Sequence, residues 1–193
     1  MTKTSSDLNP ILIDVPSKLE TERLLLRAPE SGDGVEVNSA IRYSIEELRE
    51  WLVFAQTVPE VQETEANLRE ARAKFINRES LRYLIFDKEI KALIGTISFE
   101  NINWKIPKAE IGYWINTHFA GKGYMTEAVD QLTAFGLEYL GFKRIEILCD
   151  SENQKSRQVA ERAGYDLEGI LKNDDRSADG DELRDTCVYA RTL

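Results

Sequence analysis

The segment that most constrains the fold is a strand pattern followed by a glycine turn and a long helical pattern. Residues 109–115 read AEIGYWI, with apolar side chains at alternate positions, and residues 119–128 read FAGKGYMTEA. From Gly123 onward apolar residues recur at helical spacing as far as Gly141, a residue type that favours a helix end. A helix start leaves about four backbone N–H groups unpaired beside the positive end of the helix dipole. Because Gly121 and Gly123 allow positive φ and a close backbone approach, this turn suits a bound phosphate.

The turn alone does not identify a ligand. Lys122 places a positive charge between the two glycines, but ordinary turn chemistry explains a Gly-x-Gly sequence before a helix as well. No G-x-G-x-x-G follows the first strand pattern, and no G-x-x-x-x-G-K-[ST] occurs in the chain. The nucleotide-binding folds that those motifs mark are therefore not indicated.

The chain as a whole predicts a mixed α/β fold with a single sheet. Strand patterns cover 21–29, 81–87, 92–100, 109–115, 144–150, 165–171 and 186–192. Helical patterns cover 33–54 as one or two helices, then 60–76, about 123–140, and 153–163. A short polar turn makes a hairpin of the second and third strands, whereas a helix separates the fourth from the fifth. We therefore expect a central mixed sheet flanked by helices, antiparallel in its first part and with one parallel crossover.

Finer expectations concern the ends of the chain and its surface. Residues 1–18 are polar and proline-containing and predict an N-terminal arm, which leaves 19–193 as one domain. Residues 172–182, KNDDRSADGDE, predict a long acidic loop between the last two strands. The strand that carries Ile147 and Leu148 is predicted to be buried on both faces.

Composition and charge exclude several classes of protein. At 193 residues, with 42% hydrophobic and 31% charged residues, the chain has the size and composition of one globular domain. A formal net charge of −9 argues against a general nucleic-acid binder, because such binding rests on clustered Lys and Arg. No stretch approaches the roughly 20 apolar residues of a membrane span, and the start lacks a signal-peptide run, so we expect a cytoplasmic protein without a membrane partner. Cys149 and Cys187 have no CxxC spacing and no nearby histidine, which predicts reduced thiols and no metal site.

The order and spacing of several segments resemble the acetyl-CoA core of the GCN5-related N-acetyltransferase (GNAT) superfamily. Within it, the resemblance is to the branch that acetylates ribosomal-protein N-termini, and it covers residues 19–193. No single motif is specific, and the resemblance rests on the combination. The segments that carry it are ETERLLLRAP (20–29), WLVFA (51–55), AEIGYWI (109–115), GKGYMTEA (121–128) and KRIEILCDSENQKSRQVAERAGY (143–165).

One part of the superfamily signature is different here. The usual acetyl-CoA signature is Gln or Arg, two residues, Gly, one residue, then Gly or Ala. With its first glycine aligned on Gly123, Ala120 stands where Gln or Arg is common, and Met125 stands where Gly or Ala is common. Phosphate contacts in this family come mainly from the backbone, which the two side-chain differences leave in place.

The resemblance implies where acetyl-CoA binds. The cofactor would lie where strands 109–115 and 144–149 splay apart, with backbone groups of the first strand bonding the acetyl and pantetheine groups and the turn holding the pyrophosphate. No metal ion is implied. The cofactor residues implied are Tyr113, Trp114, Ile115, Gly121, Lys122, Gly123, Tyr124, Met125, Thr126, Asn153 and Ser156.

Acetyl transfer to an amine also needs groups that move protons. Asn153 is a natural N-cap for the helix that ends near Gly164, and capping alone explains that asparagine. The resemblance adds a contact to the pantetheine arm and gives Ser156 the role of protonating the departing thiolate. For the base, Glu100 at the end of its strand is the first candidate and Glu110 its rival, although either glutamate also suits an ordinary exposed position. His118, alone in a loop, is expected to be exposed and not catalytic.

The acceptor side is less defined by the sequence. Trp51 and Phe54 recur about one helical turn apart, and core packing explains both, but in the resembled branch this region borders the acceptor site. We therefore expect one of the two aromatics to wall the amine pocket. The acidic residues of 174–182 would lie near the same opening and attract a cationic acceptor, unless they form an ordinary surface loop.

Three functions remain in view. The resemblance favours an acetyl-CoA-dependent N-acetyltransferase that transfers acetyl directly to a primary amine, first of all a ribosomal-protein N-terminal α-amino group. Direct transfer is expected because neither cysteine lies where a covalent acetyl-enzyme would clearly form. The alternatives are an acetyltransferase of small amines, such as a polyamine or an aminoglycoside, and a binding module that holds acyl-CoA without catalysis. A homodimer is expected from the resemblance only.

Overall fold

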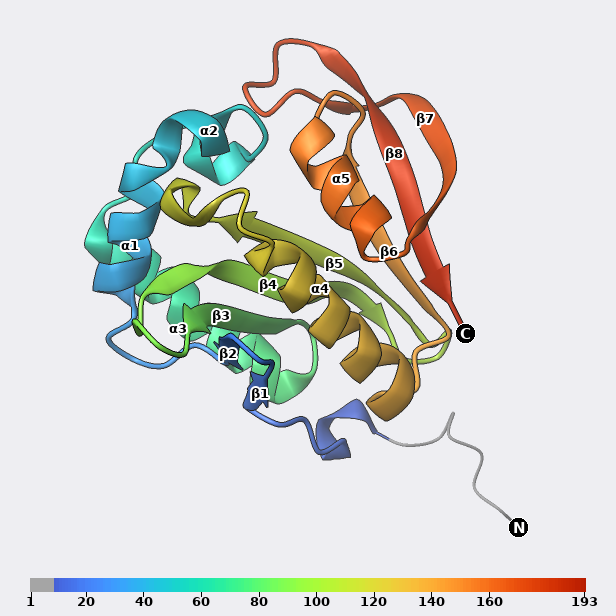
Figure 1. Cartoon of the computed structure of the whole chain (residues 1–193), viewed down its shortest axis with the longest axis horizontal. Coiled ribbons are helices and arrows are strands. Elements are labelled where there is room, and N and C mark those ends of the chain that lie inside the picture. The colour runs from blue at the N-terminus through green and yellow to red at the C-terminus, as the bar shows by residue number, and fades with distance from the viewer. Residues whose placement is uncertain (1–8) are drawn as a thin grey trace.

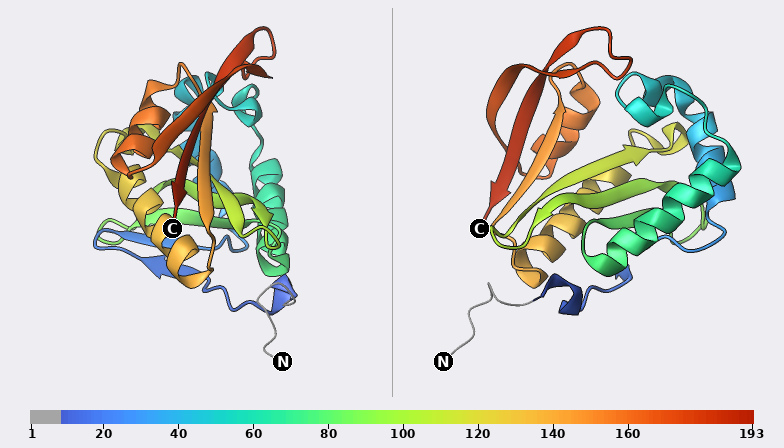
Figure 2. Two further views of the ribbon diagram at one scale, coloured as in Figure 1. Left: turned by 90° about the vertical axis from the view of Figure 1, so that its right-hand side faces the viewer. Right: turned by 180° about the vertical axis from the view of Figure 1, so that it is seen from behind.

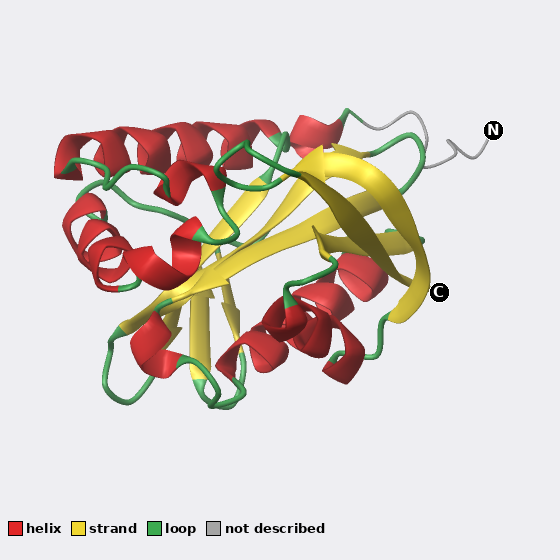
Figure 3. Ribbon diagram, turned by 90° about the horizontal axis from the view of Figure 1, so that it is seen from above, coloured by secondary structure: helices red, strands yellow, loops and turns green. Residues whose placement is uncertain are grey.

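The computed structural model of the chain describes residues 9–193, which form an eight-stranded sheet with helices on both faces (Figure 1; Figure 3). The strands are β1 (Lys18–Glu20), β2 (Leu24–Arg27), β3 (Leu81–Asp87), β4 (Leu93–Asn103), β5 (Lys108–Ile115), β6 (Arg144–Asp150), β7 (Asp166–Arg176) and β8 (Leu183–Thr192). The α-helices are α1 (Gly34–Tyr43), α2 (Ile45–Arg49), α3 (Val61–Asn77), α4 (Tyr124–Ala134) and α5 (Gln154–Arg162). Short 3-10 helices cover Pro10–Leu12, Val53–Ala55 and Thr117–Phe119, and a π-helical turn covers Phe135–Tyr139.

The sheet confirms the predicted mixed topology. Its strand order is β1-β2-β3-β4-β5-β6-β8-β7, and β5 pairs with β6 in parallel while the other neighbouring pairs are antiparallel. The crossover from β5 to β6 runs through α4, as a parallel connection requires. The single sheet with its antiparallel first part was therefore predicted correctly.

Helices cover the two faces of the sheet unequally. On one face α1 contacts β4 and α3 contacts β3, while on the other α4 contacts β2, β4 and β5, and α5 contacts β6 and β7 (Figure 2). The buried stripe of α4, which includes Ala128, Val129 and Leu132, fixes that helix on the sheet. Burying a leucine or valine side chain contributes about 1.5–3 kcal/mol each. The packing therefore holds the start of α4 firmly beside the end of β5.

The parallel pairing of β5 with β6 is short. It joins Lys108 to Arg144, Ala109 to Ile145 and Glu110 to Glu146, and the two strands then diverge (Figure 1). From Gly112 to Ile115 the strand β5 is paired on its β4 side. The backbone edge of β5 that faces β6 therefore has no strand partner over these residues.

Two predicted element ends were wrong. Strand β4 does not end at Glu100 but continues to Asn103, with a register shift after Glu100 and a left-handed Asn101 at φ 50°. The predicted loop 172–182 is strand in its first part, because β7 extends to Arg176, and residues 177–182 connect it to β8, which begins at Leu183. An exposed edge strand accepts charged side chains on its open face, so the charged composition of 172–176 did not mark a loop.

The prediction that β6 is buried on both faces was also wrong. Ile147 is 1% exposed under the helical layer, whereas Leu148 on the opposite face is 39% exposed. Helices α1 and α3 contact strands earlier in the sheet and leave that face of β6 open. Strand β6 is therefore covered by helices on the Ile147 face alone, and Leu148 lies on the uncovered face.

The predicted arm lies partly outside the described residues, which begin at residue 9. The Tyr83 hydroxyl donates to the Pro16 carbonyl at 2.8 Å, and Arg78 donates to the Ile13 carbonyl at 2.9 and 3.0 Å. Residues 9–17 are thus held against the sheet, and the boundary between arm and domain at 18/19 stays a prediction. Among residues 9–193, no helix is long and apolar enough to cross a membrane.

Candidate active site

The glycine turn has the backbone conformation that the sequence predicts. Gly121 has φ 74° and Gly123 has φ 79°, and α4 begins at the next residue, Tyr124. A Cβ atom on Gly121 would have no atom within 4 Å, and one on Gly123 would lie 3.6 Å from an Arg23 nitrogen. The requirement for glycine here is therefore the left-handed backbone and not a lack of space.

Arg23 holds this turn from the strand β2 side. Its Nη1 donates to the Lys122 carbonyl at 3.1 Å, and its Nε donates to a Glu127 carboxylate oxygen at 2.6 Å. The guanidinium carbon lies 4.4 Å from the centroid of the Tyr124 ring. Because these contacts join residues about a hundred positions apart, no local sequence signal indicates them. They fix the Lys122 carbonyl, which lies between the two glycines.

A cavity lies beside the diverging strands, on the same face as α5, and we call it the α5-side cavity. It collects six of the eleven residues predicted to bind a cofactor, together with Trp51. The residues of the turn itself do not line it, although Gly123 and Thr126 line an open groove further along α4. The six are Tyr113, Trp114, Ile115, Met125, Asn153 and Ser156.

Asn153 and Ser156 stand at the start of α5, where Asn153 Oδ1 accepts the Ser156 backbone N–H at 3.0 Å. The predicted N-cap is therefore present. The Ser156 hydroxyl lies 2.9 Å from the Tyr113 hydroxyl, and the latter also lies 3.1 Å from the Ser156 carbonyl. Burial raises the pKa of the Tyr113 hydroxyl, so it stays protonated at neutral pH and remains able to donate. The sequence did not indicate this pair of hydroxyls within the cavity.

Cys149 lies on β6 close to these two hydroxyls. Burial raises the pKa of its thiol to about 11, and the Ser156 side chain has a smaller opposite effect. Because the thiolate is the nucleophilic form, this thiol is a poor nucleophile at neutral pH. Cys187 faces it across the β6–β8 pair, and both thiols are free.

A second cavity, of about 500 Å³, lies on the other face of β4 and β5, under α1 and α3. We call it the α3-side cavity. Glu100 lines it, and Leu52, Tyr113 and Trp114 line both cavities, so the two meet at β5. Glu110 pairs with Glu100 across the strands but does not line the cavity, and it accepts from Asn101 at 2.8 Å. Burial raises the pKa of the Glu110 carboxyl.

Trp51 and Phe54 are separated in a way that their spacing did not predict. Helix α2 ends at Arg49, so Trp51 lies in the turn that follows and Phe54 in a 3-10 helix. Trp51 lines the α5-side cavity and Phe54 lines the α3-side cavity. The two aromatics therefore do not share one helical face, because the chain bends between them.

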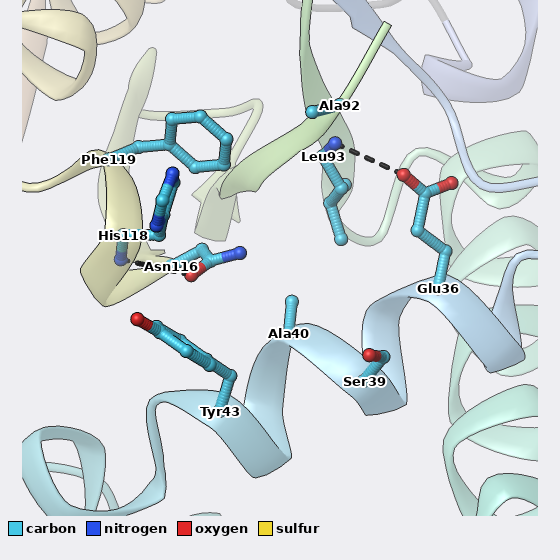
Figure 4. A pocket seen from close by; sticks show the side chains of 9 residues that line it. All are labelled: Glu36, Ser39, Ala40, Tyr43, Ala92, Leu93, Asn116, His118 and Phe119. Carbon is cyan, nitrogen blue, oxygen red and sulfur yellow. Dashed lines mark hydrogen bonds between the residues drawn. The ribbon is translucent and has the colours of Figure 1, made fainter.

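His118 lies away from both cavities, in a shallow pocket between α1 and the loop before α4 (Figure 4). Its ring packs edge-on against Phe119 and Tyr43, with centroids 4.9 and 6.2 Å apart. Its backbone N–H donates to Asn116 Oδ1 at 3.1 Å. The structure thus keeps His118 apart from Ser156 and Glu100.

The acidic hairpin 174–182 is tied to the start of α5. Glu182 pairs with Arg184 at 3.0 Å, and Arg184 also pairs with Glu152, the residue before the cap Asn153. This contact places the hairpin beside the N-terminus of α5. Its role in attracting a cationic acceptor stays a prediction. Among residues 9–193, no group of three or more His, Cys, Asp or Glu side chains is arranged to hold a metal ion.

Comparison with known proteins identifies the family. Residues 23–166 match the acetyltransferase (GNAT) domain family. The chain is a member of the GNAT family of N-acetyltransferases. It is 33% identical over 155 residues to YdaF of Bacillus subtilis (strain 168), a proposed ribosomal N-acetyltransferase, with 79% of this chain and 82% of YdaF covered.

Solved GNAT structures share the whole fold. The ribosomal alpha-N-protein acetyltransferase RimL, in complex with coenzyme A, superposes with a TM-score of 0.83 and 26% identity, covering 93% of this chain and 97% of RimL. The microcin self-immunity acetyltransferase MccE, in complex with acetyl-CoA and AMP, gives a TM-score of 0.85 and 25% identity, covering 93% of this chain and 98% of MccE. The predicted GNAT fold and the N-acetyltransferase class are confirmed.

Some residues that shape this GNAT site were not predicted. Arg23 at the turn, the Tyr113 hydroxyl beside Ser156, and Arg82 in the α3-side cavity each depend on contacts between elements distant in sequence. None of these positions carries a local signal such as a cap, a turn or a period.

Proposed function

We propose that the chain transfers acetyl from acetyl-CoA directly to the α-amino group of a protein, with a ribosomal protein as the favoured acceptor. The ribosomal choice is supported by the names of YdaF and RimL among its relatives. The use of acetyl-CoA is supported by family membership and by the ligand of MccE. The geometry supports the direct route, because two cavities meet at β5 from opposite faces.

The observation that carries the proposal is the end of the β5–β6 pairing at Glu110 and Glu146. Beyond it, the backbone N–H and C=O groups of Gly112 to Ile115 on the β6 side have no strand partner. Backbone groups of this kind need hydrogen bonds, and an extended ligand with amides provides them in the manner of an added strand. The pantetheine arm of acetyl-CoA is such a ligand, and the chain at Tyr113 to Ile115 would hold it.

The turn Gly121 to Gly123 and the first residues of α4 would hold the pyrophosphate. Their free N–H groups stand at the positive end of the α4 dipole, and the positive φ of both glycines brings the backbone close to the ligand. Lys122 is exposed and adds a charge near the same place. Tyr124, Met125 and Thr126 would contribute mainly through their backbone.

Acetyl transfer needs a base for the amine and an acid for the leaving thiolate, and we place the base on the α3 side of β5 and the acid on the α5 side. Acetyl-CoA supplies the acetyl group as a thioester, whose C–S bond breaks as the new amide C–N bond forms. On the α3 side, Glu100 would take the proton of the acceptor amine, directly or through water, and Phe54 would wall the amine pocket. On the α5 side, the Ser156 hydroxyl would give its proton to the leaving sulfur and take up a proton that passes from solvent through the Tyr113 hydroxyl, so that both hydroxyls end protonated. Asn153 would position this serine through the helix cap.

An acceptor screen tests the proposal. The purified chain is incubated with acetyl-CoA and either a ribosomal-type N-terminal peptide, a polyamine or an aminoglycoside, and release of coenzyme A is followed. We expect turnover with the peptide. Turnover on small amines with none on peptides would contradict the ribosomal assignment. Binding of acetyl-CoA by calorimetry, with no acceptor consumed, would instead support a non-catalytic binding module.

A further inference from the structure

The floor of the α3-side cavity contains a guanidinium that the proposed chemistry does not use. Arg82 on β3 is opposite Ser98 on β4, which is opposite Gly112 on β5. These three residues form one row across the sheet on the face of the cavity, and all three line it. Adjacent strands are about 4.8 Å apart, so the row spans roughly 10 Å from Arg82 to the strand that would hold the thioester.

Gly112, which has no side chain, leaves space in the cavity above its end of this row. Its φ is not in the left-handed region, and a Cβ atom there would meet only Ser98 Oγ at 3.9 Å and Glu100 Cγ at 4.0 Å, which are ordinary contacts. The fold therefore accepts a side chain at this position. Since none is present, the space between Arg82 and β5 stays available to a ligand.

The guanidinium of Arg82 has few partners for a half-buried charge. Within residues 9–193 it donates one side-chain hydrogen bond, from Nη1 to Asn67 Oδ1 at 2.7 Å, and it has no carboxylate within 4.0 Å. Arg27 and Arg144, which are also half-buried, pair with Asp33 and Glu146 at 2.6 Å each. Burial lowers the pKa of Arg82, with Glu100 acting in the opposite direction from a distance. A guanidinium carries five N–H donors, so Arg82 retains donors for an oxygen in the cavity.

We infer that Arg82 is a specificity-determining residue that binds a carbonyl or carboxylate oxygen next to the acceptor amine. The cavity then offers an acceptor, Glu100, for the amine and a donor, Arg82, for the neighbouring oxygen. This pattern fits a primary amine that is α to a carbonyl group, as in a peptide N-terminus or a free amino acid. A polyamine brings further positive charges and no such oxygen, so Arg82 disfavours it.

The inference rests on the proposed function and deepens it. The experiment compares the wild type with Arg82→Met, using acetyl-CoA and four acceptors: an N-terminal peptide, a free amino acid, spermidine and ethanolamine. The matched control is Arg72→Met, because Arg72 is a half-buried arginine on α3 that lies outside the cavity. Its guanidinium carbon lies 5.7 Å from the centroid of the Phe75 ring. Circular dichroism and acetyl-CoA binding establish that each variant is folded.

For the α-amino carbonyl acceptors, we expect Arg82→Met to raise KM about tenfold or more with a smaller change in kcat, since a charge-assisted hydrogen bond to the ground state is lost. For spermidine and ethanolamine, we expect kcat/KM of Arg82→Met to be unchanged or higher. The Arg72→Met control should leave all four acceptors unchanged.

The remaining outcomes separate this inference from the proposed function. Equal losses on all four acceptors, or no change on the peptide, would overturn the role of Arg82 and leave the ribosomal proposal standing. A wild type that uses free amino acids but no peptide, with KM sensitive to Arg82→Met, would support Arg82 and reject the protein acceptor. A wild type that prefers spermidine, or that uses no acceptor in the panel, would overturn the inference together with the proposed acceptor.

Discussion

The two cavities that meet at β5 are built in different ways. The polar groups of the α5-side cavity come mainly from a strand edge and a helix start, namely the unpaired edge of β5, the cap Asn153 and the serine three residues later. The α3-side cavity takes its polar groups from side chains on α3, β3 and β4, including Glu63, Arg82 and Glu100. The first arrangement suits a ligand that is recognised through amides like those of a protein backbone. The second suits selection among acceptors that differ in charge and shape.

The largest expected effect comes from filling the floor of the α3-side cavity. Gly112→Val adds a branched side chain between Arg82 and β5, on the face away from α5. We expect kcat/KM for an N-terminal peptide to fall by about 100-fold or more, which corresponds to roughly 2.7 kcal/mol, while calorimetry shows acetyl-CoA still bound. Gly169→Val is the matched control, because that strand glycine has nothing within 4 Å. If acetyl-CoA binding is lost together with turnover, the two cavities are not separate in function.

Removing the proton donor on the α5 side should have the next largest effect. Ser156→Ala deletes the hydroxyl that lies 2.9 Å from the Tyr113 hydroxyl. We expect kcat to fall about 10-fold to 100-fold with acetyl-CoA affinity maintained, and Tyr113→Phe to cause a smaller loss, because the serine remains. Ser39→Ala, on α1 and outside both cavities, is the control. Steady-state kinetics that show an unchanged kcat would exclude Ser156 as the acid.

A change in the turn should weaken binding without affecting the acceptor side. Gly123→Ala forces a Cβ residue into φ 79°, which costs about 1–2 kcal/mol. We expect acetyl-CoA affinity, measured by calorimetry, to fall about tenfold, with the preference among acceptors unchanged. Gly180→Ala has a similar strain at φ 84°, but it lies in the β7–β8 hairpin and should leave affinity unaltered. Equal affinity losses in the two variants would show that strain, not phosphate contact, is responsible.

The smallest effect is expected outside both cavities and serves as a baseline for stability. Glu65 accepts N–H groups of Gly32 and Gly34 and pairs with Arg69, and these contacts lower its pKa from 4.5 to about 2. Because the folded pKa lies below the unfolded one, its stabilisation is present above about pH 4.5 and is lost as pH falls towards 2.

Glu65→Gln should therefore lower the urea midpoint at neutral pH. The difference from the wild type should shrink progressively through the acid range, with kcat/KM unaltered at neutral pH. A difference in midpoint that is independent of pH would contradict the assigned role of the carboxylate.

The difference between locally determined groups and groups brought together by the fold also explains which parts of the site the sequence predicted and which it missed. The positive φ of Gly121 and Gly123 and the cap at Asn153 are set by neighbouring residues, so local patterns indicated them correctly. The row from Arg82 to Gly112 depends on strand register, and nothing local marks it. The acidic composition of 172–182 suggested a loop throughout, yet pairing with β8 makes its first part, up to Arg176, strand. Local sequence patterns therefore could not predict residues whose role depends on contacts between elements that are distant in the chain.

The central claim is that acetyl-CoA and the acceptor amine meet across β5 from opposite faces. The most direct measurement is the affinity of a bisubstrate conjugate, in which coenzyme A is joined through an acetyl bridge to the N-terminal nitrogen of a peptide. A chain that engages both halves at once should bind the conjugate about 100-fold more tightly than coenzyme A alone, and Gly112→Val should abolish the gain. A conjugate that binds no more tightly than coenzyme A would contradict this account.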